Sequence, residues 1–344
     1  MIGALTDVRA KTCPTGKFQR LPDFSNSRHC GGMEKRLPRF ERAAVAPMQL
    51  TERDRTVIRL VHRHRFLSSR QIIALMGDSQ LQVLRRLKLL YHHGFLERPR
   101  AQLQYYDTPG TRPIVYGLSA KGGMLLKQEL GDILLWSEKN QGIGQVFLEH
   151  ALLVSETMVS LELACRKHGI RLRYEDELEL PVEKQPFQWR VKIAGGMNLG
   201  VIPDRVFALE YTDQAGQIER AYFFLEADRG TMPVVRKQLT QTSFRRKLLA
   251  YEATWDNKVH QRHLGIPRFR VLTVTTIAAR VQSLLLACSQ LKRGHGLFLF
   301  ADQSVLKMDL FSPIWRNGKT GALSPLLDLP IRQVLASPDF LANP

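Results

Sequence analysis

The sequence predicts an α+β protein of two domains, of which the second contains a mixed central sheet. The chain has 344 residues and is 44% hydrophobic, which is enough for two folded cores of ordinary size. Residues 51–118 show three helical patterns followed by two strand patterns. Residues 145–305 then show the order helix, three strands, helix, strand, helix, strand, in which strands and helices contribute to one layered core.

The first 48 residues are predicted to be a disordered basic tail. They contain Gly, Pro, Ser, Arg and Lys without any sustained hydrophobic period. Cys13, His29 and Cys30 are too few and too scattered to favour a metal site. Met48 immediately precedes the first structured pattern, so it is a candidate for the natural start of the protein.

Three capping signals open three successive helical patterns within residues 51–94. They are Thr51 with Asp54, Ser68 with Gln71, and Ser79 with Gln82. Strand patterns follow at residues 95–100 and 113–118, on either side of a polar loop. This order is that of a winged helix-turn-helix, which we predict over residues 49–135.

The third helix is predicted to read DNA. If Leu84 and Tyr91 face inward, the helical period places amide and guanidinium groups on the outer face, where they can reach base edges and phosphates. The candidates on this helix and on the following wing are Ser79, Gln82, Arg85, Arg86, Arg98 and Arg100. Residues 51–100 hold 11 Lys or Arg against 4 Asp or Glu, which favours double-stranded DNA over a merely solvated face or a protein contact.

The second domain is predicted over residues 145–305. A long amphipathic helix spans residues 146–168 and carries His150, which by itself is more typical of a structural histidine than of a ligand. A polar excursion then precedes a hairpin, and a helix begins at Pro233. The remaining elements are strands at 171–175, 268–275 and 296–300, a helix at 278–291, and an irregular C-terminal tail at 306–344.

Three carboxylates are predicted to meet at the end of the hairpin formed by residues 201–231. Asp204 enters its first strand, and Glu226 and Asp228 leave its second strand on one face, because alternate strand residues point the same way. Clustered acids repel one another and favour a divalent cation or a basic partner. The alternative is that these are ordinary solvated acids at strand ends.

Pro203-Asp204 and Glu226-Ala227-Asp228, with the order of helices and strands around them, resemble the core of the PD-(D/E)xK nuclease superfamily. In that motif a lysine stands where this chain has Asp228, which puts catalysis in doubt; Lys247 or Lys237 on the next helix is a candidate replacement. The resemblance implies a metal site of Asp204, Glu226 and Asp228 that binds Mg²⁺, with these acids and Lys247 as candidate catalytic residues.

Residues 50–300 also resemble the plasmid replication-relaxation family, in the winged helix, the helix with His150, Ile202-Pro203-Asp204, Phe224 to Thr231, and Lys247-Leu248 with Tyr251. That resemblance implies a plasmid or mobile-element protein that acts in replication, DNA relaxation or mobilisation. Its implied partners are DNA and a relaxase or replication initiator.

The charge of the chain agrees with a nucleic-acid partner. The formal net charge is +18 and the pI about 10.1, no apolar run is long enough to cross a membrane, and four scattered cysteines without C-x-x-C pairs favour a reducing, cytoplasmic setting. The sequence therefore favours a DNA-binding accessory protein without an established enzymatic activity. The first alternative is a Mg²⁺-dependent endonuclease or nickase, and a weaker one is a transcriptional regulator whose second domain senses a ligand.

Overall fold

The computed structural model describes residues 40–105, 112–131, 140, 142–180, 187–193, 195–213 and 215–327. Most of the predicted N-terminal tail, residues 1–39, lies outside the described residues. For residues 42–48 the prediction of disorder is wrong, because they pack on the following domain. Arg42 donates to Glu97 Oε1 at 2.7 Å, the Ala43 amide donates to His92 Nδ1 at 3.0 Å, and Met48 packs against a buried core.

Residues 49–131, which we call the N-terminal module, contain four helices and a three-stranded antiparallel sheet in the described part of the chain. The strand order in this sheet is β1-β3-β2. The elements are α1 (Glu52–His64), β1 (Phe66–Ser68), α2 (Ser69–Met76), α3 (Gln80–His92), β2 (Leu96–Glu97), a 3-10 helix η1 (Arg100–Tyr105), β3 (Val115–Leu118) and α4 (Ala120–Leu130). The predicted order of three helices before two strands is confirmed, with β1 as an additional short strand.

Two of the three predicted capping boxes form. Thr51 and Asp54 cap α1 reciprocally, and Ser68 and Gln71 do the same for α2. The third prediction is wrong: Ser79 is the N-cap of α3 but makes no side-chain capping bond. Instead, the Gln82 side chain accepts a hydrogen bond from Arg53 Nη1 at 3.3 Å.

Residues 145–327, the sheet module, are built around a seven-stranded mixed sheet of order β12-β11-β10-β9-β8-β7-β4. Its β8 runs parallel to β9, and β9 runs parallel to β10, while the other neighbours are antiparallel. The elements are α6 (Gln145–His168), β4 (Arg171–Tyr174), η2 (Glu175–Glu177), β5 (Trp189–Lys192), β6 (Asn198–Val201), β7 (Arg205–Thr212), β8 (Ile218–Asp228), α7 (Phe244–Asp256), α8 (Val259–Arg262), β9 (Phe269–Thr275), α9 (Ala278–Ser289), η3 (His295–Leu297), β10 (Phe298–Asp302), η4 (Gln303–Lys307), β11 (Trp315–Asn317) and β12 (Leu323–Ser324).

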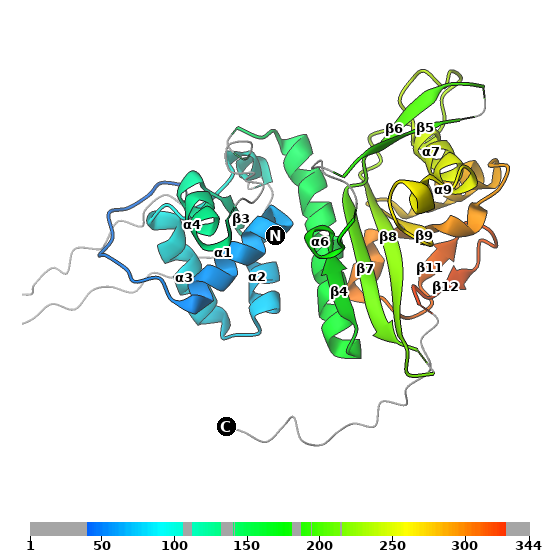
Figure 1. The fold of residues 1–344 in the computed structure, drawn as a ribbon. Coiled ribbons are helices and arrows are strands. Elements are labelled where there is room, and N and C mark those ends of the chain that lie inside the picture. The colour runs from blue at the N-terminus through cyan, green and yellow to red at the C-terminus, as the bar shows by residue number, and fades with distance from the viewer. Residues whose placement is uncertain are drawn as a thin grey trace, which may run out of the picture. The chain divides into compact units, whose positions relative to one another are not determined.

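Helices cover both faces of this sheet (Figure 1). The alternation of side chains along a strand divides its residues between two cores. On β8, Phe223 and Leu225 face α6, whereas Phe224 faces α7 and α9. Glu226 and Asp228 continue the series of Phe224, so both acids are directed to the face of α7 and α9.

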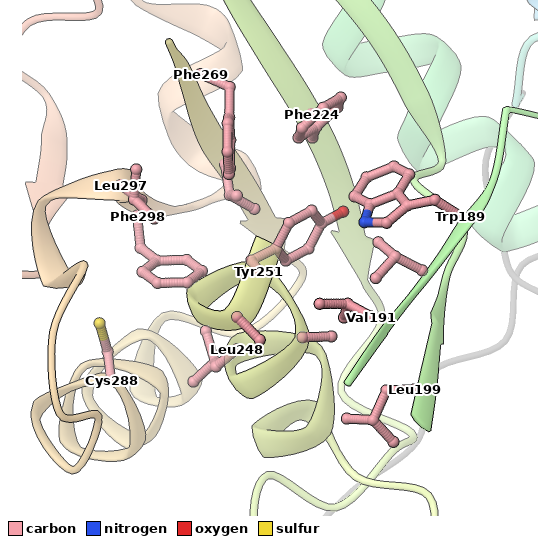
Figure 2. Packing of buried hydrophobic residues seen from close by; sticks show 14 of the residues in the cluster. Trp189, Val191, Leu199, Phe224, Leu248, Tyr251, Phe269, Cys288, Leu297 and Phe298 are labelled. Carbon is pink, nitrogen blue, oxygen red and sulfur yellow. The ribbon is translucent and has the colours of Figure 1, made fainter. Parts of the chain in front are cut away.

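The core on the α7 side includes a two-stranded antiparallel hairpin, β5-β6, which the sequence does not predict. Figure 2 shows Trp189 and Val191 of this hairpin close to Tyr251 of α7, with Phe224 on the sheet beyond. The indole Nε1 of Trp189 donates to Thr254 Oγ1 at 2.8 Å, so its polar atom is satisfied in the interior. Aromatic packing therefore anchors the hairpin to the helix.

Two further boundaries differ from the prediction. The helix predicted to begin at Pro233 begins only at Phe244, and residues 233–243 form a loop. The expectation of an irregular tail after Lys307 is wrong for its described part, because β11 and β12 extend the sheet there. Trp315 is fully buried in the core on the α6 side, which gives this segment an apolar anchor that periodicity over so short a stretch does not reveal.

Helix α6 belongs to the cores of both modules. Leu153 and Met158 pack against the seven-stranded sheet, whereas Val159 belongs to the core of the N-terminal module. Ser155 Oγ also donates to the His64 carbonyl at the end of α1, at 3.0 Å. The described residues between 40 and 327 accordingly form one compact unit.

None of the helices in the described residues is long and apolar enough to cross a membrane.

Candidate functional site

Asp204 lies between β6 and β7, beside the end of β8. Its amide donates to the Leu225 carbonyl at 3.0 Å, and its Oδ2 accepts from the Ala227 amide at 2.7 Å. The hairpin thus brings Asp204 next to the residue that separates Glu226 from Asp228, as the sequence predicts.

The second carboxylate oxygen of Asp204 binds His150 of α6. His150 Nε2 donates to Asp204 Oδ1 at 3.0 Å. This hydrogen bond and the aspartate charge raise the pKa of His150, against the effect of burial. Burial alone would raise the pKa of the Asp204 carboxyl, but His150 and the charge of Lys247 outweigh it and hold the pKa below its ordinary value. The contact therefore favours the protonated form of His150 and the ionised form of Asp204.

Glu226 lies on β8, where its carboxylate is almost completely buried, with 1% exposure. The ammonium group of Lys247 forms an ion pair with Glu226 Oε2, and the Tyr251 hydroxyl donates to Oε1 at 2.6 Å. Burial raises the pKa of Glu226, and Lys247 opposes this rise. Burial in turn lowers the pKa of Lys247, but Glu226 and Asp204 together raise it above its ordinary value.

Asp228 does not join the other two acids. Its carboxylate forms an ion pair with Arg280 of α9, and its Oδ1 also accepts from the Gly230 amide at 3.2 Å. Arg280 additionally donates to the Met232 carbonyl, so this pair fixes the turn that follows β8. Asp228 has a structural partner of opposite charge.

The three acids of the predicted metal site, Asp204, Glu226 and Asp228, are paired with cations of the protein itself in this structure. Within the described ranges, no group of three or more His, Cys, Asp or Glu side chains is placed to hold a metal ion. The physical reason is that each of the three acids is directed to a different cationic partner: Asp204 to His150, Glu226 to Lys247, and Asp228 to Arg280. These donors do not fit Mg²⁺ as a set.

A cavity of about 430 Å³ opens beside these residues. Its lining includes His150, Asp228 and Lys247, together with Phe147 of α6 and Phe244 of α7. Arg229 also lines the cavity and forms an ion pair with Glu149. The three basic side chains that line this cavity each have an acidic partner in the protein: His150 has Asp204, Lys247 has Glu226 and Arg229 has Glu149.

The sequence predicts the three acids and the nearby ammonium group of Lys247, but not the contacts of His150 with Asp204 and of Arg280 with Asp228. The sequence favours a structural role for His150, although this residue contacts Asp204 directly. Tyr251 follows Lys247 by one helical turn, so both can reach the same carboxylate, and that spacing is a usable sequence signal. No local pattern predicts Arg280, which reaches Asp228 from a helix 52 residues later.

The candidate DNA-contacting residues divide into two groups. Ser79, Gln82, Arg85 and Arg100 are exposed, as a reading face requires. Val83, Leu87, Leu90 and Tyr91 form the inward face of α3. Leu84, which is predicted to face inward, is 36% exposed, and Leu81 is 77% exposed.

The other two candidates are held by the protein itself. Arg86 Nε donates to Oδ1 of the buried Asp54 at 2.8 Å, and its Nη2 pairs with the same carboxylate. Arg98 Nη2 donates to the Tyr116 hydroxyl at 3.2 Å, and its guanidinium stacks on the Tyr91 ring at 3.9 Å. Both side chains are oriented toward their own module, so the prediction that they face DNA is not supported by this geometry.

A model of the replication-relaxation family matches residues 58–268, which is more than half of the chain. The chain belongs to the replication-relaxation family. The family match includes α3 and His150, together with the residues around Asp204, Glu226 and Lys247. It ends at residue 268, just before β9, so Arg280 and the strands β9, β10, β11 and β12 lie beyond it. No curated protein and no solved structure matches the chain.

Proposed function

We propose that this member of the replication-relaxation family is a DNA-binding accessory protein of a plasmid or other mobile element, acting in replication, relaxation or mobilisation. The family description supports the setting, and the net charge of +18 supports a polyanionic partner. In this proposal the N-terminal module is a winged helix, with α3 as the reading helix and the β2-β3 hairpin as the wing.

The observation that carries the proposal is the exposed face of α3. Arg85 is exposed and has no acidic partner among the described residues, and Ser79 and Gln82 are exposed on the preceding turn. A guanidinium group can bind guanine in the major groove with two hydrogen bonds, and an amide can bind adenine. Arg86 has a different role in this proposal: it holds α3 against α1 through Asp54, and so orients the reading face. In this proposal the exposed Arg100 contacts a phosphate.

A salt titration of DNA binding tests this proposal. The full-length protein should bind duplex DNA with an affinity that falls by roughly 0.9 log units per log unit of salt for each phosphate contact. Arg85→Gln should weaken binding by about 1–3 kcal/mol if the side chain reads a base. Arg171→Gln is a matched control, because Arg171 is an exposed arginine on the edge strand β4. Salt-independent binding, or no binding, contradicts the proposal.

For the sheet module we propose a fold similar to the PD-(D/E)xK nucleases that serves mainly as a platform. One observation favours nuclease activity as the second candidate function: Lys247 on α7 places an ammonium group against Glu226, although position 228 is an acid. Incubation of supercoiled plasmid with and without Mg²⁺ or Mn²⁺ tests it directly. Relaxed or linear product that disappears in Asp204→Ala supports a nuclease, and its absence in the wild type excludes one.

We also propose a relaxase or replication initiator as the protein partner, on the basis of the family description. Co-purification of the full-length chain with the relaxase or initiator encoded on the same element, at a salt concentration that dissociates DNA, tests this partner.

A further inference from the structure

A second basic surface lies on the sheet module, in the loop that follows β8 and in the first turn of α7. Residues 229–251 contain six Lys or Arg and no Asp or Glu. Arg229 and Lys247 have acidic partners, Glu149 and Glu226. The structure records no acidic partner, within the described ranges, for the other four residues, which we call the loop cations: Arg236, Lys237, Arg245 and Arg246.

The loop that carries these cations is held in place by its backbone. The Phe244 amide donates to the Pro233 carbonyl at 3.0 Å, and the Arg245 amide donates to the Val234 carbonyl at 2.9 Å. Arg246 Nη1 donates to the Thr240 carbonyl at 2.8 Å. Backbone contacts therefore close the loop on the start of α7, and among the described residues the exposed side chains of Arg236 and Lys237 form no hydrogen bond or ion pair.

One of the loop cations, Arg246, borders the candidate site. A cavity of about 210 Å³ is lined by Ser243, Arg246 and Lys247 on this side, and by Leu199 and Gly200 of β6 on the other. Met232 and Lys247 also line the 430 Å³ cavity described above, so the two hollows adjoin. The β5-β6 hairpin is also without acids between residues 187 and 201.

We propose that the loop cations bind the phosphate backbone of duplex DNA as a second contact, separate from that of α3. Four like charges without acidic partners repel one another, and a bound polyanion relieves this repulsion. Binding also releases counterions from the polyanion, which favours the complex. Unpaired bases are normally held by aromatic side chains; residues 229–243 contain none, and Phe244, which follows them, is buried. The chemistry of the surface therefore matches a duplex backbone. This inference rests on the proposed DNA-binding function.

The test uses the full-length protein and a labelled random-sequence duplex of about 40 base pairs between about 50 and 200 mM salt. The triple variant Arg236→Gln, Lys237→Gln, Arg245→Gln should bind more weakly. The slope of log affinity against log salt concentration should decrease in magnitude by about 1 for each phosphate that the variant no longer neutralises. The control variant is Arg268→Gln, Lys292→Gln, Lys319→Gln, which removes the same number of charges from exposed positions. Arg268 precedes β9, at the end of the sheet opposite Asp228. Thermal unfolding of both variants checks that they fold.

The outcomes separate this inference from the function on which it rests. If the affinity of the triple variant depends on salt as in the wild type, while Arg85→Gln binds more weakly, the second contact is overturned. The proposed function then stays in place. Equal losses of affinity in the triple variant and its control show general attraction by charge and also overturn it. A loss of affinity confined to a single-stranded probe overturns the duplex assignment. If the wild type binds no duplex, the proposed function and this inference both fail.

Discussion

Arg86 on α3 donates from Nε to Oδ1 of Asp54 on α1 at 2.8 Å, and Asp54 is fully buried. Burial raises the pKa of the Asp54 carboxyl, but the hydrogen bonds from Arg86 and Thr51 bring it below its ordinary value. An arginine that the helical period assigns to the outer face therefore holds two helices together.

Removal of Arg86 should destabilise the protein. Arg86→Ala leaves a buried carboxylate without its main partner, which costs about 1–3 kcal/mol. Chemical denaturation monitored by circular dichroism measures this loss of stability. Arg85→Ala is the comparison, because Arg85 is exposed, and it should change stability by less than about 0.5 kcal/mol while weakening DNA binding. Equal stability of the two variants would contradict the structural role of Arg86.

Loss of the Lys247 ammonium group should make stability depend strongly on pH. In Lys247→Met the buried Glu226 loses its cation, so its pKa rises further above the unfolded value. A carboxyl with a raised folded pKa is most favourable when protonated, so the variant should be near wild-type stability at about pH 5 and lose about 2 kcal/mol by about pH 8. Denaturation curves across this range test it. Adding Glu226→Gln should recover part of the stability at high pH.

The pair of His150 and Asp204 should also make the stability of the wild-type protein depend on pH, through the charge of the histidine. Because the folded pKa of His150 is raised, its contribution to stability is complete below the unfolded value of 6.5 and is lost as the pH rises through the folded pKa. His150→Gln should lack this decline. The difference between the two stability profiles, and the imidazole titration followed by NMR, measure it. A histidine that titrates below 6.5 would show that the contact with Asp204 does not persist in solution.

The C-terminal strands should be essential to the fold. Trp315 is fully buried and its indole Nε1 donates to the Leu310 carbonyl at 2.9 Å. Trp315→Ala should cost about 3–5 kcal/mol, as for other large buried aromatic side chains. Met308→Ala, at a position that is 57% exposed, is the control and should have little effect. Thermal unfolding of the two variants distinguishes a core segment from an irregular tail.

The elements that the sequence predicts well are those with strong local signals. The capping boxes of α1 and α2, the long helix α6 and the β7-β8 hairpin all follow from residue spacing. The orientation of α3 is harder to predict, because Leu81 and Leu84 are apolar but exposed, and Val83 supplies the buried position instead. The partners of the acids escape prediction because Arg280 and His150 reach them from distant elements, which no local period encodes.

The sharing of α6 between two cores has a practical consequence for dissecting this protein. Arg205, the residue after Asp204, donates from Nη2 to the Arg63 carbonyl at 3.0 Å, next to the contact between Ser155 and His64. A truncation before α6 would remove the Arg63 and His64 carbonyls, which accept these hydrogen bonds, from the C-terminal fragment. It would also expose the side of α6 that carries Val159. The properties of either fragment would then differ from those of the intact protein, so binding and activity are best assigned by point substitution rather than by truncation.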